Sequence, residues 1–328
     1  MKQSIITGLL MVALLFVPPL FFAAAPADPA PSAPPPAEET QPSPLDSQTV
    51  LRVWNGTAVE EMTLAAYLPG VVRGEMPAAF EPQALAAQAV AERTYIYYHL
   101  RGGPKDAHPD ADICMDPSCC NAWVSEDKAR EKWGDKYDAY EAKIDQAVSD
   151  TDGQVILYDG APILAAFHSS SAGITANSAD VWTSDLPYLH SVTSPESGDT
   201  VPNYYSVTTV AAEDFRATFL AAHPDAVLEG DCAGWITGVT ENDSGRVESA
   251  AVGGVTVRGT ELRSLYGLRS ASFTVSAGED GITFHVTGYG HGVGMSQYGA
   301  NELAKEGKTW QEIIAWYYTG VTIGPMPG

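Results

Sequence analysis

Hydrophobic and polar residues divide the chain into three stretches, and the first is almost wholly apolar. After Met1 and Lys2, residues 5–25 carry hardly any polar side chains, and a run of that length can cross a hydrocarbon core of about 30 Å as a helix. Pro18 and Pro19 interrupt this run, and the three alanines at its end resemble the small-residue cleavage site of secretory signals. We expect residues 1–25 to be a membrane anchor or a cleaved signal.

The second stretch, residues 26–48, is dominated by Pro, Ala, Ser and acidic residues. Such a composition buries too little apolar surface to fold and forms extended spacers. We expect it to tether the globular part, residues 49–328, to the bilayer. The protein would then be a single-pass cell-membrane protein with an extracytoplasmic domain, or a secreted protein if the signal is cleaved.

The third stretch opens with a short strand over residues 50–54 and two predicted helices. Apolar residues recur at helical spacing after Thr63, which is placed to cap the first helix. The second helix is predicted to begin near Pro82, because proline is tolerated in a first turn, and to run to Gly102. Glu75 is therefore expected in a tight turn between the two helices.

The rest of the globular part predicts sheet followed by helices. Residues 125–149 suit a solvated helix, and Asp159-Gly160 joins two strands, 155–158 and 162–167, in a hairpin. β-branched runs between residues 236 and 287 predict antiparallel sheet with one short helix near 260–266. A glycine-rich loop then leads into two helices, the second opened by a capping box at Thr309 and Glu312. We predict an α+β fold, with helices at the N- and C-terminal ends of the globular part around antiparallel sheet.

Charge narrows the range of partners. The 328 residues include 41 acidic ones and carry a formal net charge of -23, and no basic stretch rises above this background. That balance argues against binding to nucleic acid or anionic lipid headgroups. A neutral or cationic partner, such as a bare polysaccharide, is easier to accommodate.

Three of the four cysteines lie in one stretch, HPDADICMDPSCC, residues 108–120. In an exported protein an even number of cysteines favours disulfides, for example between Cys232 and one of the cluster. Cys119 and Cys120 are adjacent, however, so a bridge between them would be strained. The C-x-x-C pattern of redox proteins is absent.

A zinc site is the alternative that we favour. His108, Cys114, Cys119 and Cys120 supply four donors within thirteen residues, which is enough to close a tetrahedral Zn²⁺ site. Three thiolates and one neutral histidine would leave the site with a net charge of -1. With no position open for water, one zinc per chain would be structural, ordering a loop that cannot pack by itself.

Three segments in order resemble one known family. They are YLPGVVRGEMPAAFEPQALAAQAVAERTY, FHSSSAGITANSADVWTSDLPYL and GYGHGVGMSQYGA. The chain is similar to the stage II sporulation protein D family of peptidoglycan lytic transglycosylases, from about Thr63 to Val321 and in the apolar N-terminal segment. Each motif alone is moderately specific, and the three in order are highly specific.

This resemblance implies an exocellular enzyme that acts in engulfment during sporulation. It would cleave the β-1,4 bond between N-acetylmuramic acid and N-acetylglucosamine in glycan strands stripped of their peptides, with Glu75 of the E-M-P motif as the catalytic acid. A carboxyl group acts as an acid near neutral pH only when burial raises its pKa. One carboxyl group suffices, because the muramoyl 6-hydroxyl attacks and leaves a 1,6-anhydro end. Without the motif, Glu75 would be taken as a solvated turn residue.

The remaining motif positions supply candidate sugar contacts. Arg93, in the family's A-x-R-T-Y pattern, is expected to hold sugar hydroxyls or the muramoyl carboxylate, or else to form an ion pair on the helix face with Glu92 or a neighbour. The FHSSS segment is expected to hydrogen-bond sugar rather than form a Ser-His hydrolase, since G-x-S-x-G is absent. The other candidates, Tyr188, His291 and Gln297, are expected either to contact substrate or to have only a packing role. The predicted substrate-binding residues are Arg93, His168, Ser169, Tyr188, His291 and Gln297.

Two positions qualify the resemblance. Clostridial-type members carry zinc at His-x5-Cys-x4-His-Cys, so His108, Cys114 and Cys120 match directly while Cys119 replaces a histidine. Members often carry Lys where this chain has Ala86, and any binding role of that lysine is absent here or supplied elsewhere.

Two other functions stay open. A relative of the same domain is an amidase enhancer, so the chain is alternatively a non-enzymatic glycan-binding protein that modifies another cell-wall hydrolase or sporulation protein. A zinc hydrolase is the second alternative, although it needs an open metal position and the sequence has no H-E-x-x-H motif.

Overall fold

The computed structural model describes residues 44–182, 184–278 and 281–326. The predicted anchor or signal, residues 1–25, and most of the predicted spacer lie outside the described residues. In the part described, no helix is both long and apolar enough to span a membrane. Two hydrophobic cores organise this part: buried residues between 51 and 189 and between 293 and 318 form the first core, and those between 215 and 286 form the second.

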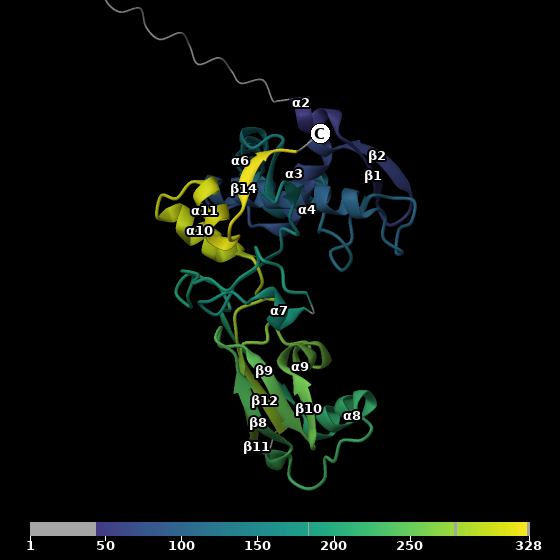
Figure 1. Cartoon of the computed structure of the whole chain (residues 1–328), viewed down its shortest axis with the longest axis vertical. Helices are drawn as coiled ribbons and strands as arrows, with labels where there is room; N and C mark the ends of the chain where they lie inside the picture. Colours follow the sequence, from purple (N-terminus) through teal and green to yellow (C-terminus); the bar gives the residue numbers. More distant parts are fainter. Residues whose placement is uncertain (1–43, 183, 279–280, 327–328) are drawn as a thin grey trace, which may run out of the picture. The chain divides into compact units, whose positions relative to one another are not determined.

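The described chain combines helices with several small, mostly antiparallel sheets, which is the mixture of an α+β fold (Figure 1). The helices are α2 (Pro44–Gln48), α3 (Leu64–Glu75), α4 (Pro82–Gly102), α5 (Glu126–Trp133), η1 (Gly134–Lys136), α6 (Tyr137–Asp150), α7 (Ser178–Val181), α8 (Ala212–Ala222), η2 (Cys232–Gly234), α9 (Gly259–Leu265), α10 (Gln297–Lys305) and α11 (Trp310–Tyr317). The strands are β1 (Val50–Trp54), β2 (Val59–Thr63), β3 (Ile113–Cys114), β4 (Gln154–Tyr158), β5 (Ala161–Pro162), β6 (Phe167–His168), β7 (Tyr205–Val210), β8 (Ile236–Glu241), β9 (Val247–Val252), β10 (Val255–Arg258), β11 (Phe273–Gly278), β12 (Gly281–Thr287), β13 (Met295–Ser296) and β14 (Thr322–Pro325).

Helix α4 is the centre of the first core. Its residues from Ala84 to Arg93 are all buried, and small side chains predominate among them. Because alanine lets helices approach closely, α4 contacts α3, α6, α10, α11 and β4 (Figure 1). The predicted N-cap of α3 is confirmed, since the Thr63 hydroxyl accepts a hydrogen bond from the Ala66 amide. The predicted capping box at the start of α11 is also confirmed.

The second core lies between two antiparallel sheets and two helices. The strand orders are β10-β9-β8 and β11-β12-β7, and α8 and α9 pack against β12 and β9 respectively. Stacked rings of Phe215, Tyr266 and Phe284 fill the middle of this core. Antiparallel sheet is therefore present where the β-branched runs predicted it. No pattern in the sequence predicted β7 or α8.

Two predicted elements differ from the structure. The hairpin turn at Asp159 and Gly160 forms, but its second strand ends at Pro162, and β6 instead pairs in parallel with β13. Residues 125–149 form two α-helices, α5 and α6, joined by the short 3-10 helix η1, rather than one helix, because Gly134 adopts a φ of 53° that ends α5. Helix α6 is also more than a solvated helix, since its Ile144 is fully buried and α6 packs on α4.

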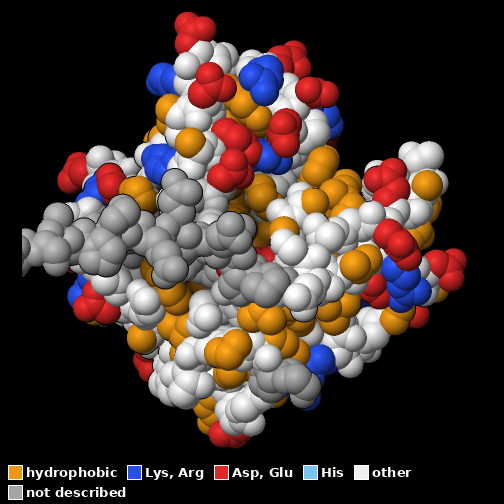
Figure 2. All heavy atoms as spheres, turned by 90° about the horizontal axis from the view of Figure 1, so that it is seen from above, with side chains coloured by type: hydrophobic (Ala, Val, Ile, Leu, Met, Phe, Trp, Pro, Cys, Tyr) orange, Lys and Arg blue, Asp and Glu red, His pale blue; other side chains and the backbone are white. Residues whose placement is uncertain are grey.

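Acidic side chains occupy several separate positions on the face drawn in Figure 2. Fewer basic side chains lie among them, and apolar side chains lie between. On this face the acidic side chains are therefore not gathered into one patch.

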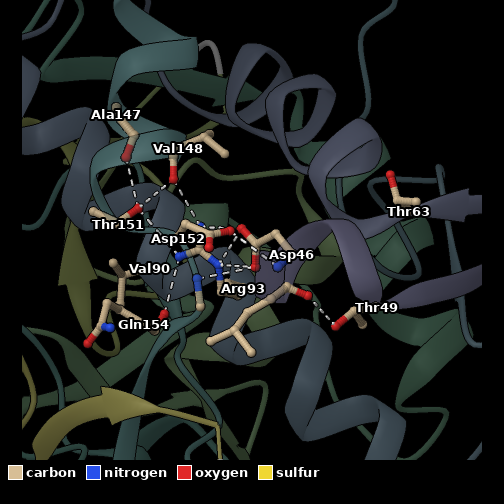
Figure 3. A network of polar contacts seen from close by, with 12 residues as sticks. Asp46, Thr49, Thr63, Val90, Arg93, Ala147, Val148, Thr151, Asp152 and Gln154 are labelled. Carbon is tan, nitrogen blue, oxygen red and sulfur yellow. Dashed lines mark hydrogen bonds and ion pairs between the residues drawn. The ribbon is translucent and has the colours of Figure 1, made fainter. Parts of the chain in front are cut away.

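The end of the predicted spacer is folded into the domain. Residues 44–48 form α2 instead of an extended tether, because Asp46 forms an ion pair with Arg93 in which Oδ2 lies 2.8 Å from Nη2. Figure 3 shows both side chains surrounded by Thr151, Asp152 and Gln154. Burial raises the pKa of Asp46, and Arg93 acts in the opposite direction. The ion pair therefore fixes α2 in place without stabilising the fold strongly by itself.

Replacing Asp46 with Ala is expected to lower the free energy of unfolding by about 3–5 kcal/mol, since it leaves a buried guanidinium without its counter-ion. Urea denaturation followed by circular dichroism measures this. The matched control is Asp112→Ala, which breaks the more exposed pair with Arg52 and is expected to cost at most about 1 kcal/mol. Equal losses in the two variants would contradict a structural role for the buried pair.

Candidate active site

A groove opens beside Glu75, where segments far apart in the sequence meet. Its walls come from α3, α4, the cysteine loop, the segment leading into β6, the end of α7 and the glycine-rich loop before β13. Each of the three motifs that carry the family resemblance contributes side chains to this one groove. The lining residues are Glu75, Tyr95, Pro117, Cys120, Asn121, Leu164, Ala165, Ala166, Phe167, Trp182 and His291.

Glu75 is the last residue of α3, with the turn beginning one residue later than expected. Its Oε1 accepts a hydrogen bond of 2.6 Å from the Ala122 amide. This approach requires glycine next to Glu75, because a Cβ on Gly74 would lie 2.5 Å from the Ala122 carbonyl oxygen. Burial raises the pKa of Glu75, and the Ala122 hydrogen bond acts in the opposite direction. The carboxyl group is therefore suited to hold a proton and to release it.

Gln297 fixes the backbone of Glu75 from the other side. Its Nε2 donates a 3.1 Å hydrogen bond to the Glu75 carbonyl oxygen. Gln297 is the first residue of α10, whose N-cap is Ser296, and the Ser296 hydroxyl donates to the buried carboxylate of Glu196 at 2.6 Å. The third motif thus contacts the backbone of Glu75 through the side chain of Gln297. Gln297 is therefore placed to orient Glu75.

A second carboxyl group, Glu92 on α4, lies behind the groove and is fully buried. Gln88 Nε2 donates to Glu92 Oε1 at 2.8 Å, and Asn121 Nδ2 donates to Oε2. Burial, followed by the charge of Glu75, raises the pKa of Glu92 well above its ordinary value. The amide oxygens of Gln88 and Asn121 have no partner within the described residues. Rotating either amide by a half turn would present an acceptor to a protonated Glu92.

The four predicted metal ligands meet in the cysteine loop. The donor atoms of His108, Cys114, Cys119 and Cys120 all lie within 4.8 Å of one another, close enough to hold a metal ion. His108 Nε2 lies 3.3 Å from Cys120 Sγ, and the Sγ atoms of Cys119 and Cys120 lie 3.8 Å apart. A tetrahedral zinc with ordinary bond lengths separates its donors by about 3.6–3.8 Å, so the donor set fits zinc.

Further contacts suit this cluster to a metal rather than to a disulfide. His108 Nδ1 lies 3.1 Å from the Ala111 carbonyl oxygen, which holds its proton on Nδ1 and leaves Nε2 free to bind. Lys105 Nζ lies 3.4 Å from Cys120 Sγ and offsets the charge of three thiolates. Cys232 is buried in the second core, and all four cysteines are unpaired.

Three consecutive residues connect the His108/cysteine cluster with the two carboxyl groups. Cys120 belongs to the cluster, Asn121 donates its side chain to Glu92, and Ala122 donates its amide to Glu75. Any displacement of the cysteine loop would therefore move the hydrogen-bond donors of both carboxyl groups.

The other predicted sugar contacts are placed differently from one another. His291 lines the groove, whereas His168 is 4 % exposed and lies behind it, with the two ring centroids 5.7 Å apart. Ser169 presents its backbone carbonyl to the Tyr298 amide at 3.0 Å. Tyr188 is buried and accepts a hydrogen bond from the amide of Leu164, a groove residue, at 3.1 Å. Of these four side chains, the structure brings His291 alone to the groove wall.

Arg93 lies away from the groove surface and is fully buried. Its contacts match the alternative prediction of an ion pair, although the partner is Asp46 and not Glu92. Its guanidinium has no exposed surface to offer a sugar, so Arg93 is left out of the proposed site.

Three aromatic side chains in the groove were not among the predicted contacts. Trp182 packs beside His291, with ring centroids 5.4 Å apart, and Tyr95 and Phe167 also line the groove. All three lie in the motifs that carry the family resemblance, so their aromatic character was a signal that could have identified them.

Replacing Glu92 with Gln is expected to flatten the dependence of stability on pH. A raised folded-state pKa contributes stability that is full below the ordinary value of 4.5 and is lost as pH rises. Glutamine cannot ionise, so the variant does not lose this stability. Its free energy of unfolding minus that of the wild type should therefore increase from about pH 5 to about pH 8. Urea denaturation at both pH values tests this, with exposed Glu131→Gln as the control. A difference that stays constant with pH would show that Glu92 is already ionised.

Comparisons with known proteins match the chain to sporulation proteins. A family model described as "Stage II sporulation protein" matches residues 55–158, which include Glu75 and the cysteine loop. The chain is 39% identical over 288 residues to stage II sporulation protein D of Bacillus subtilis (strain 168), covering 88% of this chain and 81% of that protein. The corresponding protein of Bacillus amyloliquefaciens is 37% identical over 267 residues, covering 81% of this chain and 75% of its own length.

A relative with lower sequence identity is not named as a sporulation protein. The amidase enhancer of Bacillus subtilis (strain 168) is 27% identical over 305 residues, covering 78% of this chain and 40% of that protein. The three motifs, their convergence on one groove and the identity to two sporulation proteins lead to one conclusion: the chain belongs to the stage II sporulation protein D family.

Proposed function

We propose that this sporulation protein is a lytic transglycosylase that cleaves peptide-free peptidoglycan strands between N-acetylmuramic acid and N-acetylglucosamine. The observation that carries the proposal is the presence of one carboxyl group, Glu75, among the described residues that line the groove. Hydrolases place two carboxyl groups across the scissile bond, one of them to handle water or attack the sugar. Glu92 is fully buried and does not line the groove, so it cannot serve in that way.

The reaction needs only groups that the groove supplies. Protonated Glu75 gives its proton to the glycosidic oxygen while the muramoyl 6-hydroxyl attacks C1, which breaks the glycosidic bond and closes the 1,6-anhydro ring. The Glu75 carboxylate then takes the proton lost by the 6-hydroxyl, so the enzyme returns to its starting state. The Ala122 amide, 2.6 Å from Oε1, stabilises the carboxylate that forms between these two steps.

The cysteine loop is proposed to hold one structural zinc per chain through His108, Cys114, Cys119 and Cys120. The donor separations support zinc, as does Lys105 beside Cys120. The metal supplies order rather than chemistry, because four protein ligands close the coordination sphere. A zinc hydrolase therefore finds no support in this donor set. The ordered loop holds Asn121 and Ala122 against the two carboxyl groups.

The wider setting of the enzyme is also a proposal. Residues 1–25 would anchor the chain in the cell membrane, with the groove outside the cytoplasm, or would be cleaved and leave a secreted enzyme. Engulfment during sporulation and cooperation with other cell-wall hydrolases are suggested by the family and by the amidase enhancer relative. The same likeness supports a second candidate function, that of a non-enzymatic amidase enhancer.

An assay on peptide-free glycan separates these two functions. The full chain in detergent is expected to release 1,6-anhydromuramoyl ends, detected by mass spectrometry, and Glu75→Gln should abolish them because an amide cannot donate the proton. Glu131→Gln, on the exposed face of α5, is the matched control and should retain activity. Full activity in Glu75→Gln would remove Glu75 from the mechanism, whereas no activity in the wild type would favour the enhancer.

Metal content tests the zinc site independently. Anaerobically purified protein should contain about one zinc per chain by elemental analysis, and Cys114→Ser should lose most of it. Cys232→Ser, a cysteine in the second core, should retain the metal. Chelation should lower both the thermal stability and the glycan cleavage, because the loop carries the Ala122 amide. Absence of zinc together with a disulfide from Cys232 to the cluster would refute the site.

A further inference from the structure

Strand β7 forms one edge of the sheet β11-β12-β7. Every second side chain of this strand is exposed, namely those of Tyr205, Val207 and Thr209. The exposed fraction is 70 % for Tyr205 and 63 % for Val207, although both side chains are large and apolar. Apolar side chains along the edge of a sheet mark a place where a further strand can pair.

The pairing register shows which backbone groups of β7 are free. β7 pairs with β12 along its whole length, and directly before β7 the Gly288 amide donates to the Tyr204 carbonyl oxygen at 2.8 Å. In an antiparallel pair the backbone groups of alternate residues point to opposite sides. The even-numbered residues of β7 therefore bond to β12, whereas Tyr205, Val207 and Thr209 direct their N–H and C=O groups away from it. Within the described residues no hydrogen bond reaches these groups.

Other edge strands carry features that hinder such pairing. β8 has an irregular register against β9 and ends at Glu241, and β10 ends at Arg258. β2 carries Glu60 and Glu61, and β14 ends at Pro325. β11, at the opposite edge of the same sheet as β7, is contacted by η2. Charge, proline, irregularity and coverage are the means by which sheets avoid edge-to-edge pairing, and β7 combines a regular register with the uncharged sequence YSVTTV.

The free edge of β7 is complementary to itself. When two copies lie antiparallel about a two-fold axis at Val207, each Val207 faces the other and each Tyr205 faces Thr209 of the other copy. Each of these three residue pairs then exchanges two hydrogen bonds, so every free amide meets a free carbonyl oxygen. The facing side chains are aromatic or β-branched and uncharged, as favourable cross-strand pairs are. The strand has no charge that would select a charged partner, whereas its own sequence completes the pairing.

We propose that β7 is a self-association edge at which two copies of this chain pair and join their three-stranded sheets into one. A contact made by one strand edge buries less than about 1,200 Å², the range of weak and transient interfaces. The net charge of -23 on each copy opposes association, and salt screens that repulsion. Association is therefore expected to strengthen as the salt concentration rises. The proposed membrane anchor would favour it by holding copies at a high local concentration.

Exchange of charge at Val207 tests both the contact and its register. The full chain in detergent is labelled at its N-terminus with a donor fluorophore in one batch and an acceptor in another, and energy transfer is followed as the protein concentration rises. Val207→Lys and Val207→Glu should each raise the dissociation constant at least about tenfold, because like charges then face each other. A mixture of the two variants, one with the donor and one with the acceptor, should recover association because opposite charges then face each other. Recovery also shows that both variants fold.

The matched control is the same exchange at Val239, which is 38 % exposed and lies on β8. These control variants should keep the dissociation constant of the wild type. Association through residues 1–25 would be common to all variants, so the differences among them report on β7.

Three results would overturn the proposal. They are the absence of self-association in the wild type, a loss at Val207 that the mixture does not recover, and an association that weakens as salt is added. The second result would leave the edge to a strand of another protein, and the third would point to a contact held by charges. The measurement involves no glycan, so the self-association edge and the proposed lytic activity succeed or fail separately.

Discussion

The close approach of the chain at Ala122 to the end of α3 is the contact on which the candidate active site depends. It brings one amide to 2.6 Å from Glu75 Oε1, and it is possible because Gly74 has no side chain to keep the loop away. The same loop places Asn121 on Glu92 and ends the cysteine cluster at Cys120. The position of Glu75 is thus set by the loop that the proposed zinc would order.

Burial determines the electrostatics of this region more than net charge does. Glu75 and Glu92 both have raised pKa values because burial disfavours their charged forms. The nearby histidines have lowered pKa values for the same reason. The groove therefore combines a carboxyl group of raised pKa with the neutral ring of His291. A raised pKa favours proton donation to a sugar by that carboxyl group.

The two hydrophobic cores contribute different parts of this region. The first core supplies Glu75, Glu92 and the loop with the cysteines, and Arg246 lies just before β9 of the second core. The glycine-rich loop connects these contributions, because Gln297 reaches the Glu75 carbonyl oxygen and Gly292 lies on Arg246. Glycine is required at Gly292, where φ is 84° and a Cβ would collide with the guanidinium.

Local patterns in the sequence determined what depends on neighbouring residues. They predicted the α+β class, the caps at Thr63 and Thr309, the turn at Asp159 and the four donors of the cysteine loop, whereas Glu75 was a candidate acid only through the family resemblance. Tertiary structure alone decided the partners: Asp46 for Arg93, Asn121 for Glu92, and Gln297 for the Glu75 backbone. These pairs are separated by 29 to 222 positions. Spacing along the chain carries no information about them, because burial and long-range packing bring their atoms together only in the folded protein.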